Sequence, residues 1–333
     1  MKSFTNVIWV LLLSTCWLSP LVRAAQPSWL NGDSAEFSSE QYLLGRGVGS
    51  TEVEAQNRAR GDLASIFEVR VQVANENITT VNQSSKQEQV TKQASQQVSV
   101  KTDKVISGVY IAKVWRDPDT QDFHALAVLP RSQASASLRE ELQKIDDAVD
   151  QKLQAAEATK DDLLHLGALV QALQTSIKRD AFQAMLKVVD PSGKGKVAAV
   201  SQAFIQQQIS EKLKSIKIAV EVKENALAEF SSLLKGGVAT AGFLTVAPAE
   251  ADFLLTAKLN LVDLGQRDGW YWLRANIDIA LVEQKTGRLR GNQSWPLKIS
   301  AQDNRTAHSR LMLEIEKLFA QELRVAILNF SAN

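Results

Sequence analysis

Cysteine and histidine are scarce in this sequence: Cys16 is the only cysteine, and the three histidines are far apart. Neither H-E-x-x-H nor G-x-S-x-G occurs, which removes the usual signatures of zinc peptidases and serine hydrolases. Carboxylates are common, but they are scattered along predicted helix faces and form no recognisable acid–base pair. We therefore expect a protein that is not an enzyme and that needs no cofactor or metal.

A bias of charge is also missing, because 38 lysines and arginines balance 37 acids and the formal net charge is +1. Bulk electrostatics therefore favours neither nucleic acid nor an anionic membrane as a partner. The length suggests two domains, each with enough apolar residues for a core.

The apolar run over residues 7–18 belongs to a predicted signal peptide, residues 1–24. Lys2 precedes the run, and Val22 and Ala24 are spaced as in a signal peptidase site, with cleavage after Ala24. The run is too short to make a comfortable membrane span. The chain is therefore expected to be exported.

Cys16 lies within this leader, in a degraded lipobox. Because Thr15 is a poor residue before an acylated cysteine, a lipid anchor at Cys16 is less favoured than cleavage after Ala24. The mature protein then has no disulfide, which is compatible with a bacterial periplasm. We expect a periplasmic protein that is peripheral to the outer membrane at most.

Residues 42–49 predict a short strand with three closely spaced glycines: Gly45, Gly47 and Gly49. A dinucleotide-binding loop would need its third glycine where Ser50 stands, and its sheet would need continuous apolar strands. We favour a structural interpretation. The glycines permit a bulged or positive-φ strand end and the close packing of a helix on a sheet.

Thr51 and Glu54 form a capping box and predict that a helix starts there. Its small apolar face consists of Ala55, Ala59 and Leu63. Residues 67–73 then alternate between apolar and polar side chains, the period of a half-buried strand. The sequence thus predicts a strand–helix–strand unit in an α+β domain.

The segment 74–104 is polar and contains neither proline nor glycine. Two interpretations stay open, an exposed excursion between strands and a polar helix; a sharper hypothesis is an arm that contacts a neighbouring subunit in a ring. Two further strands, 105–116 and 122–129, are joined by turn residues 117–120. His124 has no second ligand at metal-site spacing, so a structural role is favoured.

Several short motifs fall between residues 27 and 131: Pro27-Ser-Trp29, Tyr42, the Gly45-Arg-Gly47-Val-Gly49 run, Ala55 with Ala59, Val105-Ile-Ser-Gly108-Val109 and Ala127-Val-Leu-Pro130. Together they resemble the LPP-twenty family of bacterial envelope lipoproteins, and a similar domain opens the flagellar assembly protein T. The resemblance implies an α+β domain over residues 25–131. It implies structural roles for its motif residues, Trp29 and Gly108 among them, and no catalytic residues.

Helical spacing returns over residues 132–190. Two apolar stripes are present, one from Leu138 to Leu153 and one from Leu163 to Ile177. Thr159 with Asp162 offers a new N-cap between them, so we expect two successive helices that connect the domains. The Pro- and Gly-containing stretch from Asp190 lacks the spacing of a phosphate-binding loop and is expected to be a linker.

Residues 191–333 predict a second α+β domain. Its expected elements are a helix near 200–213, a strand at 216–222, a helix near 227–234 stopped by Gly236-Gly237, a three-stranded meander and a last helix at 304–329. Gln266-Arg-Asp-Gly269 is expected to form a hairpin turn, and Pro296 marks the third strand of the meander as an edge. Residues 197–330 resemble, more distantly, the periplasmic domains of penicillin-binding-protein activator and curli secretion lipoproteins.

Two tryptophans fall on the polar face of the second meander strand. Trp270 and Trp272 alternate with Tyr271 and share their face with Arg274, Asn276 and Asp278. Large aromatics on an exposed face would anchor a protein or glycan partner. We favour the alternative, that the preceding helices cover them, because layered α/β folds often bury both faces of a sheet.

Three hypotheses follow. The first is a non-enzymatic scaffold for envelope proteins at the periplasmic side of the outer membrane, as a flagellar or secretion ring accessory that also self-associates. The second is a regulator that docks on a peptidoglycan synthase. The third is a hydrolase, which would lose activity when a single histidine or acid is replaced.

Overall fold

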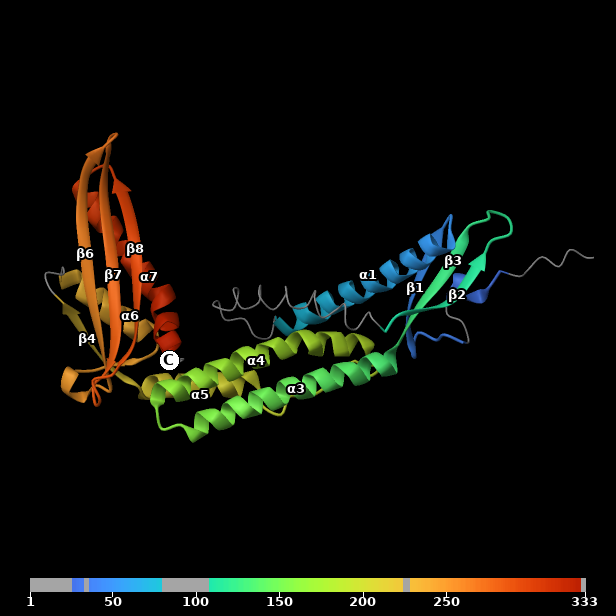
Figure 1. Cartoon of the computed structure of the whole chain (residues 1–333), viewed down its shortest axis with the longest axis horizontal. Helices are drawn as coiled ribbons and strands as arrows, with labels where there is room; N and C mark the ends of the chain where they lie inside the picture. Colours follow the sequence, from blue (N-terminus) through green and yellow to red (C-terminus); the bar gives the residue numbers. More distant parts are fainter. Residues whose placement is uncertain (1–25, 33–35, 80–107, 224–227, 331–333) are drawn as a thin grey trace, which may run out of the picture. The chain divides into compact units, whose positions relative to one another are not determined.

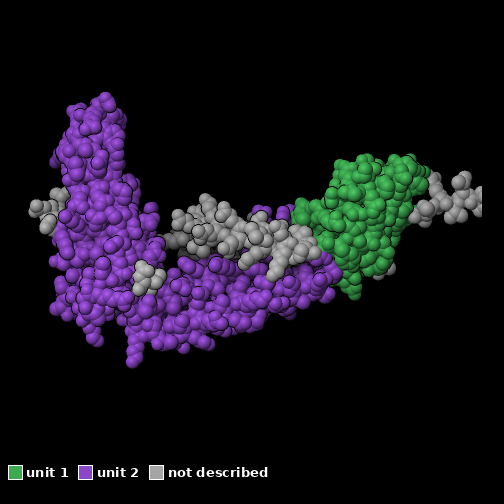
Figure 2. Space-filling model, viewed as in Figure 1, with its two compact units in different colours: residues 1–66, 109–129 green, residues 67–108, 130–333 purple. Residues whose placement is uncertain are grey.

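The computed structural model describes residues 26–32, 36–79, 108–223 and 228–330 (Figure 1). Within these ranges the chain is α+β, as predicted, and it contains one three-stranded and one five-stranded sheet. Two compact units are present, one of residues 1–66 with 109–129 and one of residues 67–108 with 130–333 (Figure 2). The predicted signal peptide with Cys16, most of the predicted polar arm and residues 105–107 lie outside the described ranges.

The first unit contains the small sheet, in the order β1-β3-β2. Its elements are the short helix η1 (Ser28–Leu30), β1 (Tyr42–Gly49), the first part of α1 (Glu52–Thr79), β2 (Tyr110–Arg116) and β3 (Phe123–Pro130). Strands β2 and β3 form the predicted antiparallel hairpin. Its turn is held by Asp117, whose carboxylate accepts a hydrogen bond from the Asp119 N–H at 2.8 Å.

The three glycines of β1 allow α1 to lie directly on the strand. A Cβ atom at Gly47 would be 2.2 Å from the carbonyl oxygen of Ala55, and one at Gly45 would be 2.4 Å from that of Ala59. Ala55 and Ala59 are fully buried. Close packing is therefore the role of these glycines. None of them has a positive φ, and the space beside the strand is filled by helix backbone.

Thr51 and Glu54 form the amino-terminal cap of α1, as predicted, but one of the two hydrogen bonds differs from that of the usual capping box. The Glu54 N–H donates to the Thr51 hydroxyl at 3.2 Å, and the Glu54 carboxylate accepts from the N–H of Ser50 at 3.0 Å. The carboxylate thus reaches one residue further back than in the usual capping box. The helix begins where the sequence predicted.

The predicted strand over residues 67–73 is wrong, because α1 continues through this segment. Phe67 and Val71 are buried, whereas Val69 and Val73 are 59% and 54% exposed. Phe67 and Val71 extend the four-residue spacing of the earlier apolar helix face, which an alternating pattern also contains. The local pattern fitted both periods, and continuation of the helix face decided between them.

The second unit includes an antiparallel helical hairpin, α3 (Arg131–Ala158) and α4 (Asp162–Val189). The two successive helices were predicted, but the N-cap is Asp161 and not Thr159: the Asp161 carboxylate accepts from the N–H groups of Leu163 and Leu164 at 3.0 and 3.1 Å. Thr159 instead accepts a hydrogen bond from the Asp161 N–H. Because the hairpin folds back, the Arg131 side chain donates to the carbonyl of Val188 at 2.7 Å.

The large sheet has the order β5-β4-β6-β7-β8. Its region comprises α5 (Gln202–Ser215), β4 (Lys217–Lys223), α6 (Ala228–Thr240), β5 (Leu244–Thr245), the short helix η2 (Pro248–Glu250), β6 (Phe253–Arg267), β7 (Trp270–Glu283), β8 (Leu289–Ala301) and α7 (Asn304–Asn329). The predicted meander β6-β7-β8 is antiparallel, and β8 lies at the edge. Asp268 and Gly269 both have positive φ, so the hairpin turn has the geometry of type I′.

Gly236 and Gly237 do not stop α6, contrary to the prediction, and the helix extends through both residues to Thr240. A Cβ atom at Gly237 would be 2.8 Å from the Cβ of Phe319 on α7. The glycine is therefore required for the close approach of two helices. A glycine pair that ends a helix and one that lets a neighbour pack cannot be separated by sequence alone.

Helices α6 and α7 share a core with one face of the large sheet. The Phe230 ring of α6 lies 5.8 Å from the Phe319 ring of α7, which in turn lies 6.3 Å from the Trp295 ring of β8. Residues of α3 and α4 near their turn, such as Val149 and Leu166, belong to the same core. Among the helices in the described ranges, none is long and apolar enough to span a membrane.

Candidate functional site

The predicted partner-binding residues alternate along β7 with residues that share a core with α6 and α7, so they lie on the other face of the strand. Figure 1 shows β7 within the large sheet. The core-facing residues Leu273, Ala275 and Ile277 are fully or almost fully buried. On the opposite face Trp270 is 44% exposed, Arg274 is exposed and Trp272 is half-buried. The alternation of this strand therefore separates a core face from an accessible face, and all three residues share the accessible one.

Lys298, rather than a helix, partly covers Trp272. Its ammonium nitrogen lies 4.6 Å from the centroid of the indole ring, a cation–π contact. Lys298 stands directly opposite Arg274 across the β7–β8 pair, and Val262, which is 50% exposed, stands opposite Arg274 on β6. We call Trp270, Trp272, Arg274, Lys298 and Val262 the aromatic–cationic patch.

Sequence reasoning missed Lys298 and Val262 as members of the patch. Both belong to strands whose alternation was recognised, but their neighbours are set by the register between strands. Pairing the Asp268-Gly269 turn as a two-residue loop would have placed Asp263 opposite Arg274, and the bulge between Asp263 and Gly265 shifts the register so that Val262 stands there instead.

The cations of the patch have no acid partner. Neither Arg274 nor Lys298 takes part in an ion pair in the described part of the chain. The acid on this face, Asp278, is engaged elsewhere: its carboxylate accepts hydrogen bonds from Asn260 at 2.9 Å, Asn276 at 2.7 Å and Ser294 at 2.5 Å. The patch is consequently basic, and side-chain hydrogen bonds link the three strands in the adjoining surface.

The end of the sheet that carries the patch is fastened to α7. The Tyr271 hydroxyl donates to the Asp263 carboxylate, and the side-chain amide of Asn304 donates to the Tyr271 oxygen at 2.5 Å. The hydrogen bond from Tyr271 holds the pKa of Asp263 below its usual value, and the same bond raises the pKa of Tyr271. Trp270 and Trp272 thus flank a residue whose side chain is hydrogen-bonded to both β6 and α7.

Among the residues that the structure describes, no group of three or more histidine, cysteine or acidic side chains is arranged to hold a metal ion. His124 packs against Trp115 with their ring centroids 5.3 Å apart, and His308 contacts the carbonyl oxygen of Asn304 at 3.0 Å. Burial, followed by the nearby charge of Lys212, lowers the pKa of His165 on α4. Each of the three histidines therefore interacts with a neighbouring residue of the folded chain: a ring, a carbonyl oxygen or a charge.

Several residues of the amino-terminal motifs lie in the core of the small domain. Trp29 is buried together with Phe37, and the Phe37 ring meets the Tyr42 ring edge-on with their centroids 5.3 Å apart. The Arg46 guanidinium, between two of the packed glycines, donates to the carbonyl of Trp29 at 2.9 Å. Gly108 lies in a turn just before β2.

Comparison with solved structures gives low similarity. A secreted protein from Helicobacter pylori, HP1454, is 12% identical, with a TM-score of 0.42 and coverage of 86% of this chain and 98% of that one. A minor lipoprotein from Acinetobacter baumannii is 14% identical, with a TM-score of 0.26 and coverage of 35% and 91%. A putative lipoprotein from Caulobacter crescentus is 17% identical, with a TM-score of 0.25 and coverage of 34% and 88%. TM-scores this low do not establish a common fold.

Comparison with curated proteins found no match. The family model described as LPP20 lipoprotein, however, matches residues 27–130. These bounds agree with the segment in which the sequence resembles the LPP-twenty family, so that resemblance is confirmed. The match covers the small α+β domain and supports an exported envelope protein. Over residues 27–130, this chain is similar to the LPP20 lipoprotein family.

Proposed function

We propose that this protein is a non-enzymatic scaffold of the bacterial cell envelope that binds an envelope protein at the periplasmic side of the outer membrane. The aromatic–cationic patch is its contact surface. The observation that carries the proposal is that exposed Trp270 shares one sheet face with Arg274, which has no ion-pair partner among the described residues. The family match over residues 27–130 and the signal-like leader support an envelope location.

The composition of the patch suits a protein partner. Tryptophan and arginine are the residue types that most often dominate binding energy at protein interfaces. The cations of Arg274 and Lys298 require an acidic counterpart, and Val262 adds an apolar edge. An acidic surface with a shallow apolar depression would satisfy all of these groups.

The charge of the patch also bears on self-association into a ring. A two-fold symmetric contact through the patch would place Arg274 and Lys298 of one copy against the same cations of the other. Such a contact is unfavourable in the absence of neutralising acids. A ring, such as one in a flagellar or secretion apparatus, would therefore use the patch in a head-to-tail contact with a different, acidic surface.

The second candidate function is a regulator that docks on a peptidoglycan synthase. It rests on the same patch, because the patch lies in the domain that distantly resembles penicillin-binding-protein activators. The two functions differ only in the partner, and the same experiment separates them.

The test is crosslinking in intact cells, followed by purification of the protein and quantitative mass spectrometry of the envelope fraction. We compare the natural chain with Arg274→Glu and with Trp270→Ala combined with Trp272→Ala. Lys285→Glu is the matched control, because it reverses an exposed charge in the turn at the other end of β7. Circular dichroism verifies that each variant is folded.

The proposal expects one envelope protein whose recovery falls at least tenfold in both patch variants and stays unchanged in Lys285→Glu. A ring or secretion component supports the scaffold, and a peptidoglycan synthase supports the regulator. Equal recovery in all variants would refute the contact surface. Cytosolic residence, or a hydrolase activity that one histidine substitution abolishes, would refute the function as a whole.

A further inference from the structure

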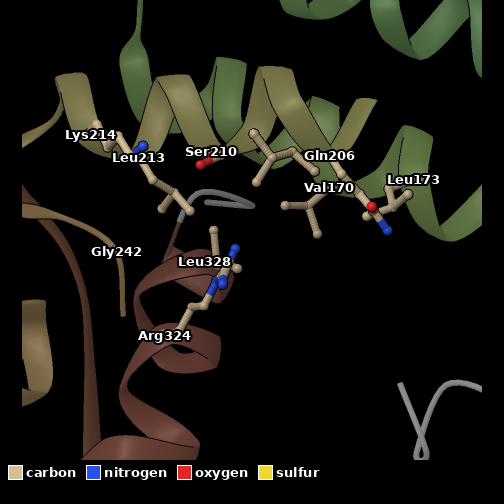
Figure 3. A pocket seen from close by; sticks show the side chains of 10 residues that line it. Val170, Leu173, Gln206, Ser210, Leu213, Lys214, Gly242, Arg324 and Leu328 are labelled. Atoms are coloured by element: carbon tan, nitrogen blue, oxygen red, sulfur yellow. The ribbon is translucent and has the colours of Figure 1, made fainter. Parts of the chain in front are cut away.

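A cavity of about 320 Å³ lies where α4, α5 and α7 meet (Figure 3). This volume is at the lower end of the range for small-molecule sites. Five aliphatic side chains supply most of its wall: Val170, Leu173, Ile209, Leu213 and Leu328. Among the described residues that line it, none is aromatic or acidic. The cavity is therefore suited to a flexible aliphatic group rather than to a flat ring.

One charged side chain reaches into this apolar space. Arg324 extends from α7 toward the aliphatic residues of α4 and α5 (Figure 3). Its side chain is partly buried, and burial lowers its pKa. Across the described residues, no hydrogen bond or ion pair involves its guanidinium. Lys214, an exposed second cation at the mouth, also lacks an ion pair there.

Two arginines of this unit that are more deeply buried than Arg324, namely Arg179 and Arg290, are paired with acids. Arg179 donates to Asp146 at 2.7 Å, and Arg290 donates to Asp161 at 2.5 Å. Partial burial of a guanidinium without such a partner is unfavourable, and the described residues that line the cavity with Arg324 include no acid. An anion bound at the edge of the aliphatic cavity would therefore supply the partner that Arg324 lacks among the described residues.

We propose that this cavity binds a single-chain amphiphile with a carboxylate head. The aliphatic chain lies against the residues of α4 and α5, and the carboxylate accepts two parallel hydrogen bonds from Arg324. The planar fork of a guanidinium matches the two oxygens of a carboxylate. At a liquid volume of about 30 Å³ per water-sized group, the cavity takes about ten such groups, a medium-length chain.

The site differs from the aromatic–cationic patch in both residues and chemistry. The patch is an open sheet face with tryptophans, whereas the cavity is a concave aliphatic pocket between three helices. Polar atoms at the cavity wall come from Gln206 and Ser210, which are able to donate further hydrogen bonds to a head group. The proposal does not depend on the identity of a protein partner.

Isothermal titration of the purified mature protein with decanoate tests the proposal. Decanol carries the same chain without charge, acetate carries the head without the chain, and decyltrimethylammonium reverses the charge. Arg324→Gln removes the cation, and Ser210→Trp fills the mouth from an exposed position of α5. Arg305→Gln is the matched control, because it makes the same change at the exposed start of α7.

Decanoate is expected to bind at least tenfold more tightly than each of the three comparison compounds. Arg324→Gln should weaken decanoate binding by about tenfold or more and leave decanol binding unchanged, as expected for a hydrogen-bonded charge. Ser210→Trp should abolish decanoate binding, and Arg305→Gln should preserve it. Equal binding of decanol, equal binding of acetate, or unchanged decanoate affinity in either cavity variant would overturn the proposal.

Discussion

Substitution of Asp161 should destabilise the second domain more than an ordinary surface change does. The Asp161 carboxylate caps α4 through the N–H groups of Leu163 and Leu164 and pairs with Arg290 of β8, whose side chain is 2% exposed. Two hydrogen bonds join the pair, and the remaining nitrogen of Arg290, Nε, has no partner. In Asp161→Ala, a buried guanidinium would lose the carboxylate with which it pairs.

The expected magnitude comes from two terms. Removing one partner of a buried ion pair costs about 3–5 kcal/mol, and losing an N-cap costs about 1 kcal/mol. Because the Asp161 side chain is 26% exposed, water replaces part of the lost interaction, and we take the lower end. Asp161→Ala should therefore lower the free energy of unfolding by about 3–4 kcal/mol, a large part of a typical domain's stability.

A double-mutant cycle in urea separates the two terms. Arg290→Met removes the buried charge, so the double variant Asp161→Ala/Arg290→Met should recover most of the loss and retain a deficit of about 1 kcal/mol from the cap. Hydrogen exchange of the β8 amides reports the same difference locally. A single-variant cost below about 1 kcal/mol, or a double variant less stable than Asp161→Ala, would refute this reasoning.

The pH dependence of stability provides a second check on Asp161. Burial tends to raise its pKa, but the hydrogen bonds from Arg290 and Leu164 outweigh burial, and the pKa lies below its usual value. The unfolded chain therefore binds the proton more tightly, and stability rises with pH through this group. The contribution should be fully present above the ordinary aspartate pKa of about 4 and lost at lower pH. Asp161→Ala should flatten this part of the profile.

Three further predictions concern other positions. Gly47→Ala should destabilise the small domain by about 1–3 kcal/mol, because the new methyl group clashes with α1. Gly61→Ala should stabilise it by about 0.5–1 kcal/mol, because nothing lies within 4 Å of the new methyl group. Thermal unfolding of both variants tests the contrast. Burial raises the pKa of Asp180, so the stability that its protonated form contributes is lost as pH rises. Asp180→Asn should therefore add about 0.5–1 kcal/mol to the free energy of unfolding at neutral pH. An unchanged unfolding midpoint would contradict this expectation. Arg324→Gln should leave the free energy of unfolding unchanged or raise it by up to about 1 kcal/mol, and a substantial loss would assign Arg324 a structural role.

The local sequence was sufficient to predict a structural feature where that feature depends on a few neighbouring residues. The alternation of β6 and β7, the Asp268-Gly269 turn and the start of α1 at Thr51 were all predictable for this reason. The candidate patch was predictable in part. Alternation placed Trp270, Trp272 and Arg274 on one face, but their neighbours depend on the strand register.

Prediction failed where one local pattern fits two structures. Residues 67–73 alternate like a strand and also continue a four-residue helix face, and burial of Phe67 and Val71 decides for the helix. Gly236 and Gly237 resemble a helix stop, yet Gly237 is there because Phe319 packs against it. The missing information in each case was the position of a distant neighbour.

By itself, the sequence determined the α+β class, the elements of the meander, the two helices that follow the small domain and the similarity of residues 27–130 to one family. Tertiary structure alone decided the parallel pairing of β4 with β6, the ion pair between Asp161 and Arg290, and the cavity that surrounds Arg324. Propensity, capping and turn chemistry act over a few residues, so they are readable in order along the chain. A buried ion pair between residues 129 positions apart exists only after the packing of sheet and helices has brought them together.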